Sequence, residues 1–266
     1  MTKPLDYFVI DAFTDRPFSG NPAAVVALSE WRDEAWLSSV AAEMNLSETA
    51  FFVPTPAGFD LRWFTPTIEV DLCGHATLAT AIAITEMQLV AENEEICFST
   101  KSGMLKARCH GKRVTLDFPI CKVTEAEPPD ELISALGVTP TYIGKSSFDY
   151  LVEAGSEAEV RSLTPDFARL STVTCRGVIV TARSTDSQFD FVSRFFAPAS
   201  GVDEDPVTGS AHCCLADFWR TRIGKETFHA IQVSDRGGII DVKIHQDRVF
   251  LSGQGVIVAQ GTLQIT

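Results

Sequence analysis

The chain has 266 residues and a formal net charge of −13. This acidic balance argues against nucleic acid or an anionic membrane surface as a partner, and no apolar run approaches the ~20 residues that a membrane span needs. The seven cysteines show no Cys-x-x-Cys spacing, so neither a disulfide framework nor a zinc knuckle is indicated. The composition predicts a reduced, cytoplasmic globular protein, long enough for two domains.

The first part of the chain predicts strands around one helix. Residues 5–13 alternate as an opening strand, and a second strand covers residues 23–28 after a Gly-Asn-Pro turn. Asp33 is placed to cap a helix with one buried face, and Asn45 suits a left-handed exit from it. Residues 49–53 then predict another strand.

Two later segments predict buried helices. Residues 75–91 leave almost no polar face, and residues 210–223 are similarly apolar and stop at Gly224. A helix that is apolar all round must be enclosed. Alternating residues at 105–110 and 113–118 predict a hairpin, which recurs around 242–251. One enclosed helix per half, flanked by amphipathic strands, favours a strongly curved sheet wrapped round that helix.

The two halves are an internal duplication. From Gly74 and Gly209 onward they keep one offset of 135 residues (209 − 74) without a gap. The pairs include Ala76 and Ala211, Ser99 and Ser234, Gly103 and Gly238, and His110 and His245. Each Gly opens a helix, and a helix start presents unpaired backbone N–H groups and partial positive charge. Two such starts facing one cleft would bind a small anion.

The predicted fold class is α+β, with two pseudo-symmetric domains that are each a barrel-like mixed sheet around a central helix. The Glu- and Pro-rich stretch 125–129 suggests the boundary, followed by a short helix at 130–136. We therefore predict domains 1–122 and 123–266, with the last strand free to return to the first domain.

Three residues stand out as candidates for chemistry. Glu48 lies at a helix-to-strand junction in an apolar stretch, where partial desolvation would raise its pKa towards that of a general base. The plain alternative is a solvated strand-end carboxylate. His75 follows a helix-opening Gly, where the helix dipole disfavours imidazolium; its alternative is a cap or a packed side chain. Asp205 precedes the second helix start, and its alternative is an ordinary N-cap.

Several other functions are disfavoured by spacing. Residues 208–212 lack the glycines of a Gly-x-Ser-x-Gly elbow, and no phosphate-loop or dinucleotide pattern occurs. The five histidines show no metal-ligand spacing, so no metal is predicted. The cysteines other than Cys73 are interpreted as small buried hydrophobes.

Several motifs resemble one family across the whole chain. They are DAFTDRPFSGNPAAVV, NLSETAFF, FTPTIEVDLCGHATLA, GVDEDPVTGSAH, SDRGG and DRVFLSGQ, and together they resemble the PhzF-like family of phenazine-biosynthesis isomerases. The resemblance implies a fold similar to that of diaminopimelate epimerase, with the active site between the two domains. It also implies catalysis without a cofactor and assembly as a homodimer.

The resemblance carries roles to particular residues. It implies that Glu48 removes and returns a carbon-bound proton, with His75, Asp205 and Ser210 completing the catalytic site. It implies that the backbone N–H groups of Gly74, Gly209 and Ser210 hold the substrate carboxylate. The predicted substrate-binding set also includes Asn21, Cys73 and Thr208. The epimerase has a thiol before each of its two glycines, whereas this chain has Cys73 and Thr208, which excludes the usual two-thiol mechanism.

The leading prediction is a cofactor-independent isomerase that moves a proton between carbons of a small carboxylate-bearing metabolite. One alternative is a racemase or epimerase that uses Glu48 and Cys73 from opposite faces. Another is a non-catalytic carboxylate-binding protein that has kept the fold. A third, in which the duplication serves only dimer assembly, predicts an exposed apolar face that the alternating strands do not clearly show.

Overall fold

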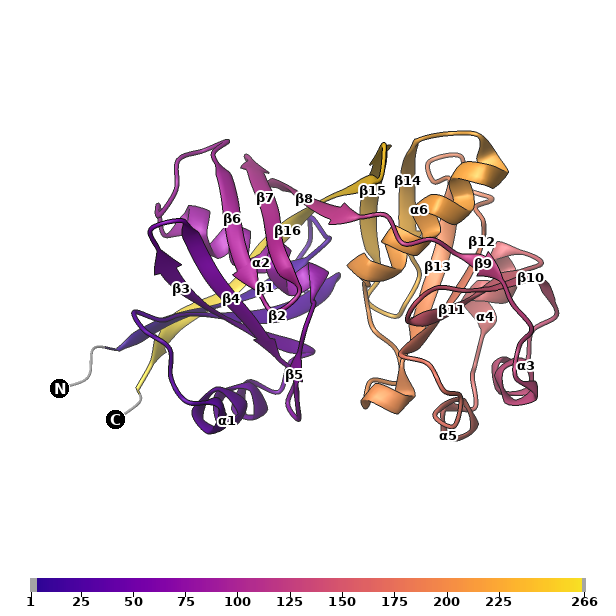
Figure 1. The fold of residues 1–266 in the computed structure, drawn as a ribbon, viewed down its shortest axis with the longest axis horizontal. Helices are drawn as coiled ribbons and strands as arrows, with labels where there is room; N and C mark the ends of the chain where they lie inside the picture. The colour runs from indigo at the N-terminus through magenta and orange to yellow at the C-terminus, as the bar shows by residue number, and fades with distance from the viewer. Residues whose placement is uncertain (1–3, 265–266) are drawn as a thin grey trace. The chain divides into compact units, whose positions relative to one another are not determined.

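The computed structural model describes residues 4–264, and the chain divides into two compact units (Figure 1). The described part of unit 1 comprises residues 4–118 and 252–264, and unit 2 comprises residues 119–251. This division falls four residues before the predicted boundary after residue 122. The last strand, β16 (Arg248–Leu263), begins in unit 2 and runs into unit 1.

Unit 1 is a closed mixed barrel. Its strands follow the order β1, β2, β3, β4, β6, β7, β8 and β16, and pairing of β1 with β16 closes the ring. The β2–β3 and β4–β6 pairs are parallel. The bounds are β1 Leu5–Ala12, β2 Asn21–Ala27, β3 Glu48–Thr55, β4 Gly58–Phe64, β6 Glu95–Thr100, β7 Gly103–His110 and β8 Arg113–Pro119; the short β5, Glu69–Val70, pairs with β4.

Helix α2 (Gly74–Glu86) is packed against the strands of this barrel and is buried along almost all of its length. Its buried threonines bond back to the helix: Thr77 Oγ1 donates to Cys73 O at 2.5 Å, and Thr80 Oγ1 to Ala76 O at 2.7 Å. The predicted helix over 75–91 is five residues too long at its C-terminal end. It ends at Glu86 because Gln88 takes a left-handed conformation, with φ 57°.

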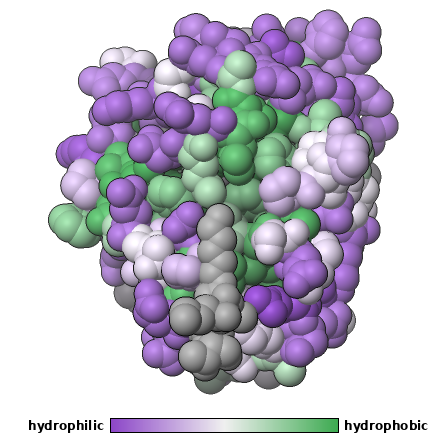
Figure 2. Space-filling model, turned by 90° about the vertical axis from the view of Figure 1, so that its left-hand side faces the viewer, coloured by the Kyte–Doolittle hydropathy of each residue, from purple (hydrophilic) through white to green (hydrophobic). Residues whose placement is uncertain are grey.

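Helix α1 (Glu34–Met44) packs by one face on the sheet, against β3 and β4. Its ends are as the sequence predicts: Asp33 accepts a hydrogen bond from Trp36 N, and Asn45 leaves the helix at φ 49°. Apolar residues show on the face of the structure in Figure 2, surrounded by hydrophilic ones. The apolar residues between α1 and the sheet include Leu37, Phe51 and Phe64.

Unit 2 is a sheet of parallel and antiparallel strands, with helix α6 (Gly209–Ile223) packed against it. Among the described residues the strand path runs from β16 through β15, β14, β13, β12, β11 and β10 to β9, without a pairing that closes it. The bounds are β9 Thr124–Glu125, α3 Asp130–Leu136, β10 Pro140–Lys145, β11 Asp149–Ala154, α4 Glu157–Ser162, α5 Phe167–Leu170, β12 Gly177–Arg183, β13 Phe191–Phe196, η1 Pro198–Ser200, β14 Thr227–Gln232 and β15 Gly238–His245.

The duplication read from the sequence is visible in the backbone of each unit. Helices α2 and α6 begin at the matched Gly74 and Gly209, and β7 and β15 begin and end at matched residues. In unit 1 the pairs from β2 to β7 are parallel, antiparallel, parallel and antiparallel, and the pairs from β11 to β15 repeat that order. Both units therefore share one topology around their central helix.

Candidate active site

The predicted site residues of unit 1 gather at the start of α2. The left-handed exit of α1 at Asn45 leads into β3, whose first residue is Glu48. Strand β2 runs parallel to β3 and begins at Asn21. Cys73 is the N-cap residue of α2, and His75 lies in its first turn. Side chains from three segments that are remote in sequence are thus brought together by one strand pair and one helix start.

His75 is at the centre of this cluster and is only 3% exposed. Its Nε2 lies 3.0 Å from Glu48 Oε2, and its Nδ1 lies 3.0 Å from Asn21 Nδ2. Cys73 Sγ is 3.5 Å from Nδ1 and 3.9 Å from Nε2. In the neutral ring, the Asn21 amide donates to Nδ1 and the ring proton lies on Nε2, where it faces the Glu48 carboxylate; in the imidazolium form both ring nitrogens donate.

The charges of this cluster are coupled. Burial opposes the imidazolium form, but the neighbouring Cys73 and Glu48 side chains outweigh it and raise the pKa of His75 well above 6.5. The sequence predicted a neutral His75 because of the helix dipole. The direction of this pKa shift runs against that prediction, because side chains in contact act more strongly than the partial charge of a helix end. Burial, together with the charge of Glu48, raises the pKa of Cys73 to about 11, so this thiol is protonated at neutral pH.

Glu48 contacts the buried His75 and is itself partly exposed to solvent. Its side chain is 16% exposed, whereas that of His75 is 4% exposed. The N-cap residue of α2, Cys73, makes no side-chain capping hydrogen bond. The anion-binding role of the first-turn amides, at Gly74 and His75, stays a prediction.

The predicted residues of unit 2 form a second cluster at the start of α6. The Thr208 hydroxyl donates to Asp205 Oδ2 at 2.5 Å. The N-cap position of the helix is Thr208, again without a side-chain capping bond of its own, and Asp205 lies before it in the chain. Gly209 is buried and Ser210 is half-buried in the first turn of the helix.

Gln232 holds this second cluster together and was missed by the sequence analysis. Its Oε1 accepts from Thr208 N at 2.9 Å, and its Nε2 donates to Asp205 O at 2.7 Å. It is fully buried at the end of β14. The only signal in the sequence is a polar residue that interrupts a strand, which is too common to identify a site.

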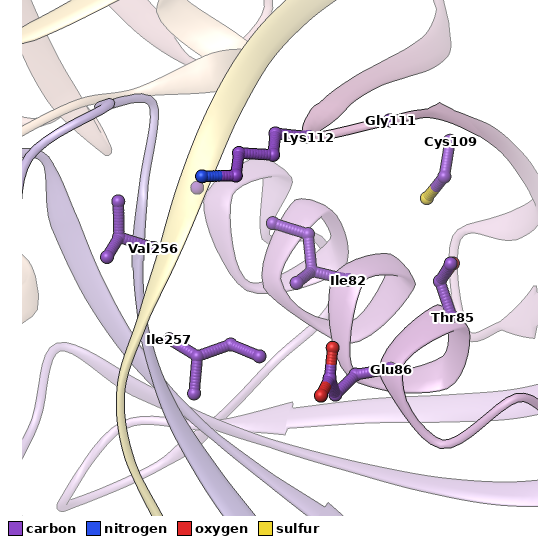
Figure 3. Close-up of a pocket in the computed structure, with 9 residues that line it drawn as sticks. Ile82, Thr85, Glu86, Cys109, Gly111, Lys112, Val256 and Ile257 are labelled. Carbon is purple, nitrogen blue, oxygen red and sulfur yellow. The ribbon is translucent and has the colours of Figure 1, made fainter.

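A cavity of about 350 Å³ lies elsewhere in unit 1, beside the second half of α2. Figure 3 shows Ile82 and Glu86 of α2, Lys112 of the β7–β8 turn, and Val256 and Ile257 of β16 around it. Its walls come from other residues than those of the predicted site. The candidate active site is therefore defined by its side-chain chemistry and not by this cavity.

The fold and these clusters define an α+β protein of two duplicated units, with a carboxylate and an imidazole in contact at the head of a buried helix. The family model for phenazine biosynthesis-like proteins, PhzC-PhzF, matches residues 10–261. The chain belongs to this family.

Relatives and solved structures agree with this assignment. An uncharacterized isomerase of Halalkalibacterium halodurans is 50% identical over 264 residues, which cover 99% of both chains. The crystal structure of a PhzF family protein from Enterococcus faecalis has a TM-score of 0.93 at 39% identity and covers 99% of this chain and 100% of its own. A predicted epimerase from Pseudomonas aeruginosa has a TM-score of 0.79 at 19% identity, covering 98% and 99%, and supports the fold alone.

The family to which the chain belongs therefore includes relatives that are named as isomerases. Within residues 4–264 no helix has both the length and the apolar character required to cross a bilayer.

Proposed function

We propose that the protein is a cofactor-independent isomerase that moves a proton between carbons of a small carboxylate-bearing metabolite, with Glu48 as its general acid/base. The observation that carries the proposal is the contact of 3.0 Å between Glu48 Oε2 and the buried Nε2 of His75. A carboxylate that is partly exposed on one side and fixed by a buried imidazole on the other has the form of a positioned proton acceptor.

The reaction follows from these groups. The Glu48 carboxylate takes a proton from a substrate carbon, and the electron pair left behind spreads into the substrate's own conjugated system. The Glu48 carboxylic acid then returns the proton to a second carbon, so the enzyme ends in its starting state. A positioned base of this kind contributes about 10²- to 10⁴-fold to the rate.

His75 acts as the positioning partner of Glu48. In the imidazolium form, favoured by its raised pKa, its Nε2–H faces Glu48 and limits the directions in which the carboxylate can turn. In this form Nδ1 also carries a proton, so the Asn21 amide holds the opposite side of the ring by turning its oxygen towards Nδ1–H. The pair therefore presents one carboxylate oxygen in a defined place, which lowers the entropy cost of proton transfer.

The role of unit 2 stays a prediction. We propose that the Gly209 and Ser210 amides bind a carboxylate of the substrate, as helix starts do, and that Asp205 and Gln232 hold Thr208 so that these amides keep their direction. The contacts that support this are the hydrogen bonds of Thr208 to Asp205 and Gln232. Asp205→Asn would then raise KM more than it lowers kcat.

Solvent exchange tests the proposal. In D₂O, a panel of unsaturated amino and hydroxy carboxylic acids is incubated with the protein, and mass spectrometry reads deuterium at carbon. We expect incorporation with the wild type and at least about 100-fold less with Glu48→Gln. Glu43→Gln, an exposed change on α1, serves as the matched control. Undiminished exchange in Glu48→Gln would end the assignment of Glu48.

One observation keeps the racemase alternative in view: Cys73 Sγ contacts the same imidazole as Glu48. A thiol whose pKa is about 11 is a poor base but can serve as an acid. Inversion of a stereocentre, together with loss of turnover in Cys73→Ser, would favour this alternative. Tight binding of a carboxylate without any proton exchange would instead favour the non-catalytic protein.

A further inference from the structure

Three side chains with different metal-binding atoms converge at the start of α2. The ligand atoms of Glu48, Cys73 and His75 all lie within 4.8 Å of one another. Cys73 and His75 are buried, and Glu48 is half-buried. We propose that this cluster binds one Zn²⁺ ion through Glu48 Oε2, Cys73 Sγ and His75 Nε2, and that the bound ion inhibits proton transfer.

The donor atoms suit zinc. Zinc prefers thiolate sulfur, imidazole nitrogen and carboxylate oxygen, with Zn–N and Zn–O bonds of about 2.1 Å and Zn–S bonds of about 2.3 Å. In a tetrahedron these lengths place nitrogen and oxygen about 3.4 Å apart, and nitrogen and sulfur about 3.6 Å apart. The observed distances from His75 Nε2 are 3.0 Å to Glu48 Oε2 and 3.9 Å to Cys73 Sγ. These two separations differ from the tetrahedral values by a few tenths of an ångström, and the third pair, Glu48 with Cys73, lies within 4.8 Å.

The bound state is neutral as a whole. Zn²⁺ with one thiolate, one carboxylate and a neutral imidazole sums to zero charge, so the buried site carries no net charge that would need solvation. Three protein ligands leave a fourth position open, which is the arrangement of accessible zinc sites. The partly exposed side of Glu48 provides that opening to water.

The surroundings of His75 also suit a metal ligand. A ligating imidazole usually holds its second nitrogen through a hydrogen bond to a neighbouring group. Asn21 contacts Nδ1 at 3.0 Å through its amide, and a turn of that amide presents its oxygen to an Nδ1–H. The inference of inhibition rests on the proposed function, because a zinc ion bound to Glu48 Oε2 withdraws electron density from the whole carboxylate and so lowers its basicity towards the substrate proton. The inference of binding does not.

Cobalt(II) serves as a spectroscopic probe of the site. We expect one Co²⁺ per chain, with a thiolate-to-cobalt charge-transfer band that Zn²⁺ abolishes in an equimolar amount. Cys73→Ser should lose the band and bind Zn²⁺ at least about 100-fold more weakly in competition with a chromophoric chelator, since even outer-shell partners of a zinc site contribute about 10- to 100-fold. Cys97→Ser, which changes a half-exposed thiol on β6, should keep both.

A second variant guards against a folding defect in Cys73→Ser. Glu48→Gln should keep the charge-transfer band, because the thiolate remains, while Zn²⁺ affinity falls by at least about 10-fold. Absence of the band in the wild type, or its persistence in folded Cys73→Ser, would overturn the proposal.

The two proposals fail separately. Zinc binding without Glu48-dependent deuterium exchange would remove the isomerase mechanism and leave the metal site. Glu48-dependent exchange that saturating Zn²⁺ does not inhibit would remove the inhibitory role.

Discussion

His212, in the middle of α6, should make unit 2 unstable in mild acid. It is fully buried, its Nδ1–H donates to Thr208 O at 2.8 Å, and its Nε2 has no partner among the described residues. The ring packs on that of Phe191, with centroids 6.1 Å apart. Burial lowers the pKa of His212 to about 4. The folded protein thus holds this imidazole neutral at a pH where the unfolded chain protonates it.

The size of the effect follows from linkage. An unfolded histidine has a pKa of about 6.5, so the folded and unfolded values differ by about 2.5 pH units, which corresponds to about 3.4 kcal/mol. This stability is fully present above pH 6.5 and is lost as the pH falls towards 4. His75 adds no slope in this window, because its folded pKa is raised and both of its states are protonated below pH 6.5.

The assay is urea unfolding followed by hydrogen exchange of peptides from residues 209–223, because the two units need not unfold together. Between pH 6 and pH 4.5 we expect the wild type to lose about 1.4 kcal/mol per pH unit from this group. His212→Gln, which keeps a donor for Thr208 O, should lose that part of the slope. His245→Gln, at an exposed position on β15, should retain it. Equal slopes for the wild type and His212→Gln would refute the reasoning.

Three further predictions concern unit 2. Burial opposes ionisation of Glu157, but hydrogen bonds from the Thr185 backbone and hydroxyl and from Arg161 lower its pKa to about 2. Glu157→Gln should therefore lower the free energy of unfolding at pH 7 by up to about 3 kcal/mol. The exposed control Glu131→Gln should not show this loss, and by linkage the loss should fade below about pH 4.5. A hydrogen bond with Cys214 lowers the pKa of Cys121 to about 6, whereas burial raises that of Cys213 to about 12. Iodoacetamide should thus alkylate Cys121 half-maximally near pH 6 and leave Cys213 unmodified in peptide mass maps, and a profile for Cys121 centred near pH 8.5 would contradict this. A Cβ on Gly177 would lie 2.2 Å from the ring of buried Phe195, so Gly177→Ala should lower the midpoint of urea unfolding by the equivalent of about 1–3 kcal/mol, while Gly155→Ala, which meets only the tip of Glu159 at 3.3 Å, serves as the control.

The sequence predicted the fold class and the family, and both are confirmed. The apolar helix and the alternating strands could be predicted because burial on one or all faces leaves a local period in the chain. The ends of α1 were equally predictable, because Asp33 and Asn45 act on neighbouring residues. The roles of the site residues, the substrate and the homodimer stay predictions.

The sequence was less informative where distant segments meet. The end of α2 at Glu86 was misplaced because apolar residues continue beyond it, into a turn that the left-handed Gln88 makes. No metal was predicted because the histidines show no metal-ligand spacing. The Glu48–Cys73–His75 cluster instead combines three residue types and joins the start of a strand to the start of a helix. The buried Gln232 bridges Asp205 and Thr208, and a single polar residue in a strand is not a sequence pattern that identifies a site.

The sequence by itself determined the duplicated topology and the residue types at each helix start, because local period and repeat register are properties of the chain. Only the tertiary structure decided the charge of His75, the partners of Asp205 and the closing of the first barrel by β1 and β16. Those features depend on contacts between segments far apart in sequence, where a carboxylate 3.0 Å from an imidazole outweighs any preference that the neighbouring residues express.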